Sequence, residues 1–179
     1  ALVSKTPIKG QGLIVWPYPY KSQDLVYNFS GSATAGAITK WFRDNLGEEE
    51  VMDQQNGGQN AYVALDEESK DITVGSDGLV VLPYFMGERA PVWNSDAKGM
   101  IFGMSLVHTK AHLYHAFQEA VCYALRHSME STGRDLGDYI VITGGVTNSK
   151  RWVQMFADVT GYAVRTPIDN AEANLGDVM

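Results

Sequence analysis

Apolar residues recur at helical spacing most clearly between Lys110 and Ser131. Positions three, four and seven residues apart are apolar there, which predicts one long amphipathic helix. The same spacing predicts a helix over about 35–46 that ends at Gly47. It also predicts a helix that Asn148 or Ser149 caps and Gly161 ends. The expected inner stripe of this last helix is Trp152, Val153, Phe156 and Val159.

Short apolar runs bounded by Gly and Pro predict strands between these helices. The run Tyr139–Thr143 is continuously apolar, so we expect it to be buried on both faces. The run Gly78–Phe85 is also expected to be a buried strand, with Leu79–Leu82 as its core. A short acidic helix is predicted over Ala61–Ser69. Further strands are predicted over Gly12–Trp16, Leu25–Asn28, Met100–Met104 and Ala163–Arg165.

Long helices alternating with apolar strands indicate an α/β fold. The 179 residues are 45% hydrophobic and 20% charged, which is typical of one sizeable globular domain. The net charge of −7 argues against nucleic acid and anionic membranes as partners. A single cysteine and no long apolar run indicate a cytoplasmic protein. Because the chain starts without Met and stops at Met179, where a helix is beginning, we expect it to be part of a larger protein.

Gly144 and Gly145 follow a predicted strand and precede a helix start at Ser149. Glycines there let a ligand approach the backbone, and a helix N-terminus favours an anion. The loop therefore suits a nucleotide, although an ordinary β–α turn has the same local sequence. The spacing matches neither the phosphate loop that ends in Lys-Ser/Thr nor the dinucleotide fingerprint.

The small residues 30–36 form a second turn into a helix, either at a ligand or as a simple cap. Lys40, one turn later, faces either a phosphate or solvent. Glu88 and Arg89 are read either as a catalytic pair or as an ion pair that fixes their loop.

His112 and His115 are too close in sequence for the i, i+4 ligand pair of a metal-binding helix. We interpret them, with His108, as surface or packing residues, and Cys122 as a small packing residue of the long helix. No metal-ligand spacing is present in the sequence.

Five segments, in this order, resemble the C-terminal domain of the FGGY family of carbohydrate kinases. The loop Pro83–Trp93 resembles the family's loop of that sequence type, and the segment Gly99–Glu119 resembles its second signature, with Gln118 departing from the usual aliphatic pair. The helix Thr34–Asp44 is similar to one ending in Trp-x-Arg-Asp. Residues 144–158 are similar to the family's adenosine motif, and residues 171–176 to the start of its closing helix.

The resemblance implies a ribonuclease H-like domain of the actin and hexokinase type, over residues 1–179. By family position, Gly36 and Lys40 would lie by the nucleotide, with Gly144, Gly145 and Ser149 at its adenosine end. Lys40 stands where some members have Gln. ATP and Mg²⁺ are the implied cofactors.

The resemblance also implies that sugar binds through an N-terminal domain, which carries the catalytic Asp and a Gly-Thr phosphate loop. The chain alone would then be inactive. Xylulose kinases are resembled most and gluconate kinases nearly as well, and a homodimer is left open. The alternatives are a non-catalytic binding module and a nicotinamide enzyme, the latter disfavoured by the glycine spacing.

Overall fold

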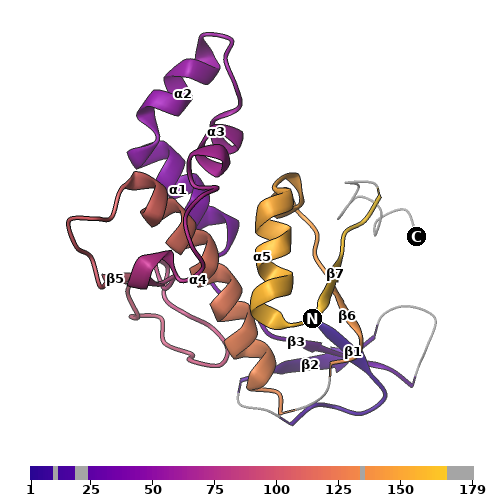
Figure 1. Ribbon diagram of the computed structural model, residues 1–179. Helices are drawn as coiled ribbons and strands as arrows, with labels where there is room; N and C mark the ends of the chain where they lie inside the picture. The colour runs from indigo at the N-terminus through magenta and orange to yellow at the C-terminus, as the bar shows by residue number, and fades with distance from the viewer. Residues whose placement is uncertain (10–11, 19–23, 134–135, 169–179) are drawn as a thin grey trace.

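The computed structural model describes residues 1–9, 12–18, 24–133 and 136–168 of the chain. Its longest element is helix α4 (Lys110–Glu130), which runs through the middle of the molecule (Figure 1). Helix α5 (Lys150–Thr160) packs along it. The other helices, α1 (Gly36–Leu46), α2 (Glu48–Gln55) and α3 (Ala61–Glu68), gather around its N-terminal half (Figure 1).

The strands form three small sheets at the periphery of α4. Strands β1 (Leu2–Ser4), β3 (Val26–Phe29) and β2 (Ile14–Pro17) form an antiparallel sheet in that order. Strand β4 (Val80–Leu82) pairs with β5 (Met100–Phe102) in an antiparallel manner. Strand β6 (Tyr139–Val141) pairs with β7 (Ala163–Arg165) in parallel. Two 3₁₀ turns, η1 (Ser76–Gly78) and η2 (Gly145–Asn148), complete the described elements.

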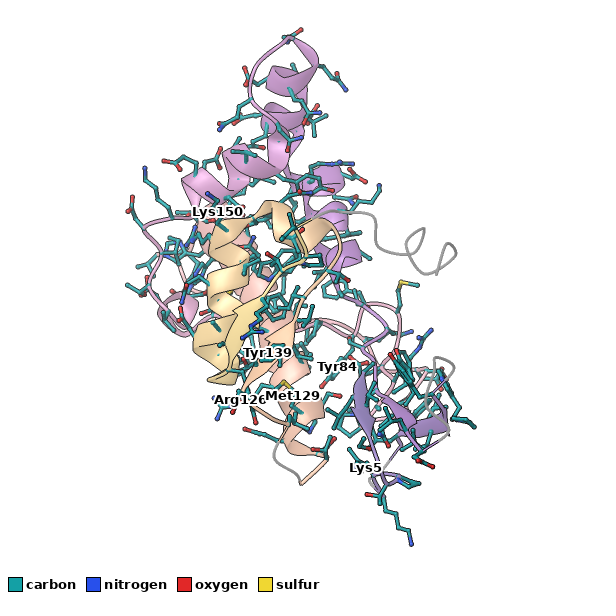
Figure 2. All side chains as sticks on the ribbon, turned by 90° about the vertical axis from the view of Figure 1, so that its right-hand side faces the viewer. Lys5, Tyr84, Arg126, Met129, Tyr139 and Lys150 are labelled. Atoms are coloured by element: carbon teal, nitrogen blue, oxygen red, sulfur yellow. The ribbon has the colours of Figure 1, made fainter. Side chains whose placement is uncertain are left out.

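Helix α4 is buried at every position from Tyr114 to Cys122, so its neighbours must cover all of its faces there. Trp152 of α5 donates from Nε1 to the Gln118 carbonyl oxygen at 3.1 Å, and Arg126 donates from Nη1 to the Val159 carbonyl oxygen at 3.0 Å. The later residue of α4 contacts the later residue of α5, so the two helices run in the same direction. Figure 2 shows Arg126 near one end of α5 and Lys150 near the other. The shared core comprises Ile38, Phe42, Leu65, Leu79, Val81, Tyr114, Phe117, Val121, Cys122, Trp152, Met155, Phe156 and Val159, with three alanines.

The three long predicted helices are confirmed within one or two residues, and Ser149 caps α5 by accepting from Trp152 N at 3.1 Å. Helix α2 was not predicted, because it has no apolar stripe. Its one buried residue, Glu50, forms an ion pair with Lys110 of α4. The predicted helix start at 171–176 lies outside the described residues.

Two expectations about strand burial are wrong. Tyr139 and Val141 of β6 are 42% and 59% exposed, because among the described residues β6 pairs with β7 alone and the face that carries these two side chains is not covered. The strand predicted at 78–85 is limited to three residues. Within it Val81 is buried while its two neighbours are exposed, since successive side chains point to opposite faces and only one face packs on α4.

Residues 75–78 form a turn whose four residues all have positive φ, between 48° and 89°. Glycine adopts this conformation readily, but Ser76 and Asp77 are strained in it by about 1 to 2 kcal/mol each. Glu119 of α4 holds the turn by accepting from Gly75 N and Ser76 Oγ, both at 2.7 Å. A carboxylate buried in α4 therefore stabilises a backbone that its own sequence disfavours.

The three histidines of the α4 region bind the same turn. The Nδ1 atom of His115 lies 2.9 Å from Ser76 Oγ. Because the Ser76 hydroxyl donates its one hydrogen bond to Glu119, it can only accept from His115, so Nδ1 is the donor. His112 Nε2 lies 3.1 Å from Asp77 Oδ2, and His108 Nε2 lies 3.3 Å from the Asp77 carbonyl oxygen. The interpretation as packing or surface residues is thus refined: they are the hydrogen-bonding partners of one turn.

The described part of the chain holds no cluster of three or more potential metal-ligating side chains. None of its helices combines the length and the apolar character needed to cross a membrane.

Burial lowers the pKa of His115, so its neutral form is favoured in the folded protein, with Glu119, Arg151 and His112 as the charged or titratable groups around it. Above the unfolded pKa of about 6.5 both states are neutral and stability is complete. As the pH falls below that value the unfolded state gains the proton first, so stability is lost until the folded pKa is passed. We expect thermal denaturation to show a larger loss between pH 7.5 and 5.5 for the wild type than for His115→Asn. The exposed His127→Asn is the control and should keep the wild-type loss; equal losses in all three proteins would contradict the role of His115.

Candidate nucleotide site

A pocket of about 770 Å³ lies between α1, α3, α4, α5 and the loop after β6. Its floor is buried and its mouth is exposed: Gln118 is fully buried, whereas Gly36, Gly145 and Asn148 are exposed. The floor carries large apolar side chains, which suits a flat ring. The full lining comprises Ala35, Gly36, Thr39, Asn60, Tyr62, Val63, Asp66, Tyr114, Gln118, Val121, Thr143, Gly144, Gly145, Val146, Asn148, Ser149, Trp152 and Phe156.

Four of the five residues predicted for the nucleotide line this pocket. Gly144, Gly145 and Ser149 come from the loop and turn after β6, and Gly36 from the first turn of α1. Gly144 needs to be glycine for its backbone, since its φ is 92°. The fold brings the two predicted loops, more than a hundred residues apart in sequence, to one cavity.

The glycines at the mouth leave open space in front of the backbone. A Cβ atom built on Gly36, Gly144 or Gly145 would meet no heavy atom within 4 Å. By contrast, a Cβ on Gly99 would lie 2.5 Å from the Phe85 ring, and one on Gly103 would lie 2.4 Å from the Gly78 carbonyl oxygen. Glycine is therefore required inside the 82–103 block by packing, whereas at the pocket mouth it keeps a space clear.

Lys40 does not line the pocket. Its ammonium group pairs with Asp44, one turn later on α1, and its side chain is 63% exposed. The α1 residue of that turn that does line the pocket is Thr39, whose hydroxyl donates to the Gly36 carbonyl oxygen at 2.9 Å.

The loop that delivers Gly36 is held by Glu88. The Glu88 carboxylate is buried and accepts from Ser32 Oγ at 2.9 Å, from Ala33 N at 3.1 Å and from Arg89 N at 2.6 Å. Among the described residues, no ion pair joins Glu88 to the Arg89 guanidinium. The ion-pair alternative is wrong, because the Glu88 carboxylate binds backbone and hydroxyl donors instead of its neighbour's charge. The catalytic alternative stays a prediction.

The pocket floor was missed by sequence reasoning. Gln118 of α4 donates from Nε2 to Asp66 Oδ1 of α3 at 2.7 Å. Arg151 of α5 donates from Nη1 to the Asp66 carbonyl oxygen and to Ser69 Oγ, both at 2.9 Å. The one available signal was a Gln inside an otherwise apolar helical stripe, and its partner lies 52 positions away on a helix with no corresponding pattern.

Burial and the nearby Asp66 raise the pKa of Tyr114, so its phenol stays protonated. Burial likewise raises the pKa of Cys122, which is fully buried in the core, so the interpretation as a packing residue is confirmed. Of the described lining residues Asp66 is the one carboxylate, and Gln118 already occupies one of its oxygens. The arrangement favours binding over acid–base chemistry.

The sheets and helices have the fold of actin- and hexokinase-like sugar kinases, as solved structures demonstrate. The crystal structure of ligand-bound xylulose kinase from Lactobacillus acidophilus aligns with a TM-score of 0.81 at 20% identity, over 98% of this chain and 34% of that one. Plasmodium falciparum glycerol kinase with ADP aligns with a TM-score of 0.77 at 20% identity, over 96% and 33%. The ribonuclease H-like fold class predicted from the sequence is confirmed.

The sequence profile of the FGGY family of carbohydrate kinases, C-terminal domain, matches residues 1–179, and the chain belongs to this family. Gluconokinase from Bacillus subtilis (strain 168) is 33% identical over 148 residues, which are 79% of this chain and 28% of that protein. Xylulose kinase from Rhodospirillum rubrum is 30% identical, with a TM-score of 0.77 over 92% and 31%. The chain therefore spans about a third of the length of the relatives it matches.

Glu88 generates a prediction about stability. Glu88→Ala removes the buried carboxylate that accepts from Ala33 N and Arg89 N, two partly buried donors, so we expect the free energy of unfolding to fall by about 1 to 3 kcal/mol. Urea denaturation measures this change. Glu67→Ala removes an exposed carboxylate paired with Lys70 and should change stability by less than about 1 kcal/mol. Equal effects of the two substitutions would contradict the assigned role of Glu88.

Proposed function

We propose that this chain is the nucleotide-binding domain of an ATP-dependent kinase that transfers the γ-phosphate to a sugar hydroxyl. The observation that carries the proposal is the set of three open glycines, Gly36, Gly144 and Gly145, at the mouth of a pocket with an apolar floor. Family membership supports ATP as the phosphate donor. We take the cytoplasm, where ATP and free sugars are available, as the compartment.

The pocket suits the adenosine part of ATP. Trp152 and Phe156 of α5 offer flat apolar surface for the base, and Ser149 begins the helix beside it. Gly36 places the N-terminus of α1 on the other side of the mouth, where free N–H groups and the helix dipole favour a phosphate. Lys40, one turn beyond, is proposed to meet the phosphate tail outside the pocket by exchanging its contact with Asp44.

The described residues do not fit a magnesium site. Asp66, the carboxylate of the pocket lining, is bound to Gln118, and the described part of the chain has no group of three or more side chains that could hold a metal ion. We therefore assign Mg²⁺ and the catalytic Asp to another part of the protein, where the sugar hydroxyl would lose its proton as the new P–O bond forms.

D-Xylulose is the proposed acceptor, with gluconate or another polyol as the alternative within the family. Solved xylulose kinases align over most of this chain, and gluconokinases and glycerol kinases stand among its relatives at similar identity. A substrate screen with ATP on the full-length protein decides among them. Nucleotide binding without turnover of any sugar would favour a non-catalytic binding module.

Gly145→Val tests the nucleotide site. Because a Cβ there meets only open space, the variant should fold normally, but its side chain would occupy the volume proposed for the nucleotide. We expect ADP affinity, measured by isothermal titration calorimetry on the full-length protein, to fall at least about tenfold. The preference among sugars should not change.

The matched control is Ala37→Val, which places the same Val side chain beside Gly36 at an exposed α1 position outside the lining. It should bind ADP as the wild type does. Unchanged ADP affinity in Gly145→Val, or an altered sugar preference, would contradict the assignment of this loop to the nucleotide.

Residues 1–179 alone are expected to be inactive. Phosphoryl transfer needs the donor, the metal and the acceptor held in line, and the described residues supply a site for the donor only. A coupled assay with ATP and D-xylulose measures the rate, and the full-length protein is the positive control. Turnover by the isolated chain would refute the proposal that the catalytic Asp and the sugar site lie in another part of the protein.

A further inference from the structure

The small sheet of β4 and β5 has one covered face and one bare face. In its antiparallel register Val80 lies opposite Phe102. Leu82 lies opposite Met100 two positions along, so the four side chains stand on the same face. All four are exposed, Met100 by 54% and Phe102 by 71%, whereas Val81 on the other face is buried in the core. The bare face of this sheet is therefore apolar at every position.

The exposed apolar surface continues in the segment that follows β5. Met104, Leu106 and Val107 are exposed as well, and the run 100–107 contains no charged residue. Among the described residues β5 pairs with β4 alone, so its other edge is bare. Proteins usually protect such an edge with charges or Pro, and β5 has neither. Monomers rarely leave a large apolar patch uncovered, so this surface has the character of a contact face.

The size and chemistry of this surface suit a second copy of the chain. Scaled by the size of each residue, the exposed fractions amount to on the order of 800 Å² per copy, which is what each partner contributes to a standard interface. A twofold interface has to be complementary to itself, and an uncharged apolar surface meets this condition. The chain carries a net charge of −7, so two copies approach most easily where neither presents a charge.

The position of this surface leaves the pocket accessible. Neither β4 nor β5 contributes to the pocket lining, and β5 lies on the other side of α4 from α5 (Figure 1). A domain that brings an acceptor hydroxyl to the nucleotide has to sit at the pocket mouth, and so has no need of the β4–β5 face. We propose that this face, with the segment 103–107, is the contact between two copies of the protein related by a twofold axis.

Sedimentation equilibrium on the full-length protein tests this inference, and the wild type should be a dimer. Met100→Glu places a carboxylate where the second copy would remove it from water without a partner. We expect its dimer dissociation constant to rise at least about a hundredfold. Because Met100 is more than half exposed within one copy, the variant should fold, which circular dichroism verifies. Phe102→Lys takes its place if it does not.

Helix α2 offers a matched control. Met52 is 53% exposed, almost the same as Met100, but lies outside the β4–β5 sheet, so Met52→Glu should keep the wild-type dissociation constant. Both variants should bind ADP as the wild type does, since neither residue lines the pocket, which keeps this test separate from that of the proposed function.

Two results would overturn the inference. A monomeric wild type would mean that another part of the protein, or a different partner, covers the face. A dimer that persists unchanged in folded Met100→Glu would mean that the two copies meet elsewhere. A dissociation constant that rises in Met100→Glu and stays in Met52→Glu supports the β4–β5 face as the contact.

Discussion

The structure depends on the complete burial of the middle of α4. Nine consecutive residues, Tyr114–Cys122, are buried, and His115, Gln118 and Glu119 among them carry polar side chains that need partners. His115 and Glu119 find theirs in the left-handed turn at 75–78, and Gln118 finds its partner on α3. Satisfying one buried helix thus fixes the positions of elements on two of its sides. Helix α5 is added on a third side by the Trp152 hydrogen bond to the α4 backbone.

The order of the long helices could be predicted because each carries its own apolar stripe and its own end signals, as Ser149 and Gly161 show for α5. Of the candidate site, the glycines could be predicted from the sequence, since a Gly pair between a strand and a helix is recognisable from neighbouring residues alone. The sequence did not indicate Asp66 or Gln118, nor that Glu88 holds the 30–36 loop, because each acts through a partner 34 or more positions away. The burial of β6 was overestimated for a related reason. An apolar sequence shows that a strand can be buried, but not whether another element of the chain covers it.

Two sets of the described glycines differ in what surrounds them. Those of the 82–103 block, such as Gly99 and Gly103, are fixed by atoms of the protein itself that leave no room for a Cβ. Those at the pocket mouth meet nothing. The first set belongs to the packing of the loop block, which contributes no lining residue to the pocket. The second set carries the proposed function, although the local sequence around it is less distinctive.

Arg151 lies in the first turn of α5, beside the loop that borders the pocket mouth, and one of its nitrogens reaches both Asp66 and Ser69 at the end of α3. The two helices form facing walls of the cavity. Arg151 is consequently a direct bridge between two helices that are otherwise joined through α4. A ligand that pushed α5 away from α3 would have to lengthen both 2.9 Å contacts at once, so the Arg151 hydrogen bonds resist widening of the cavity.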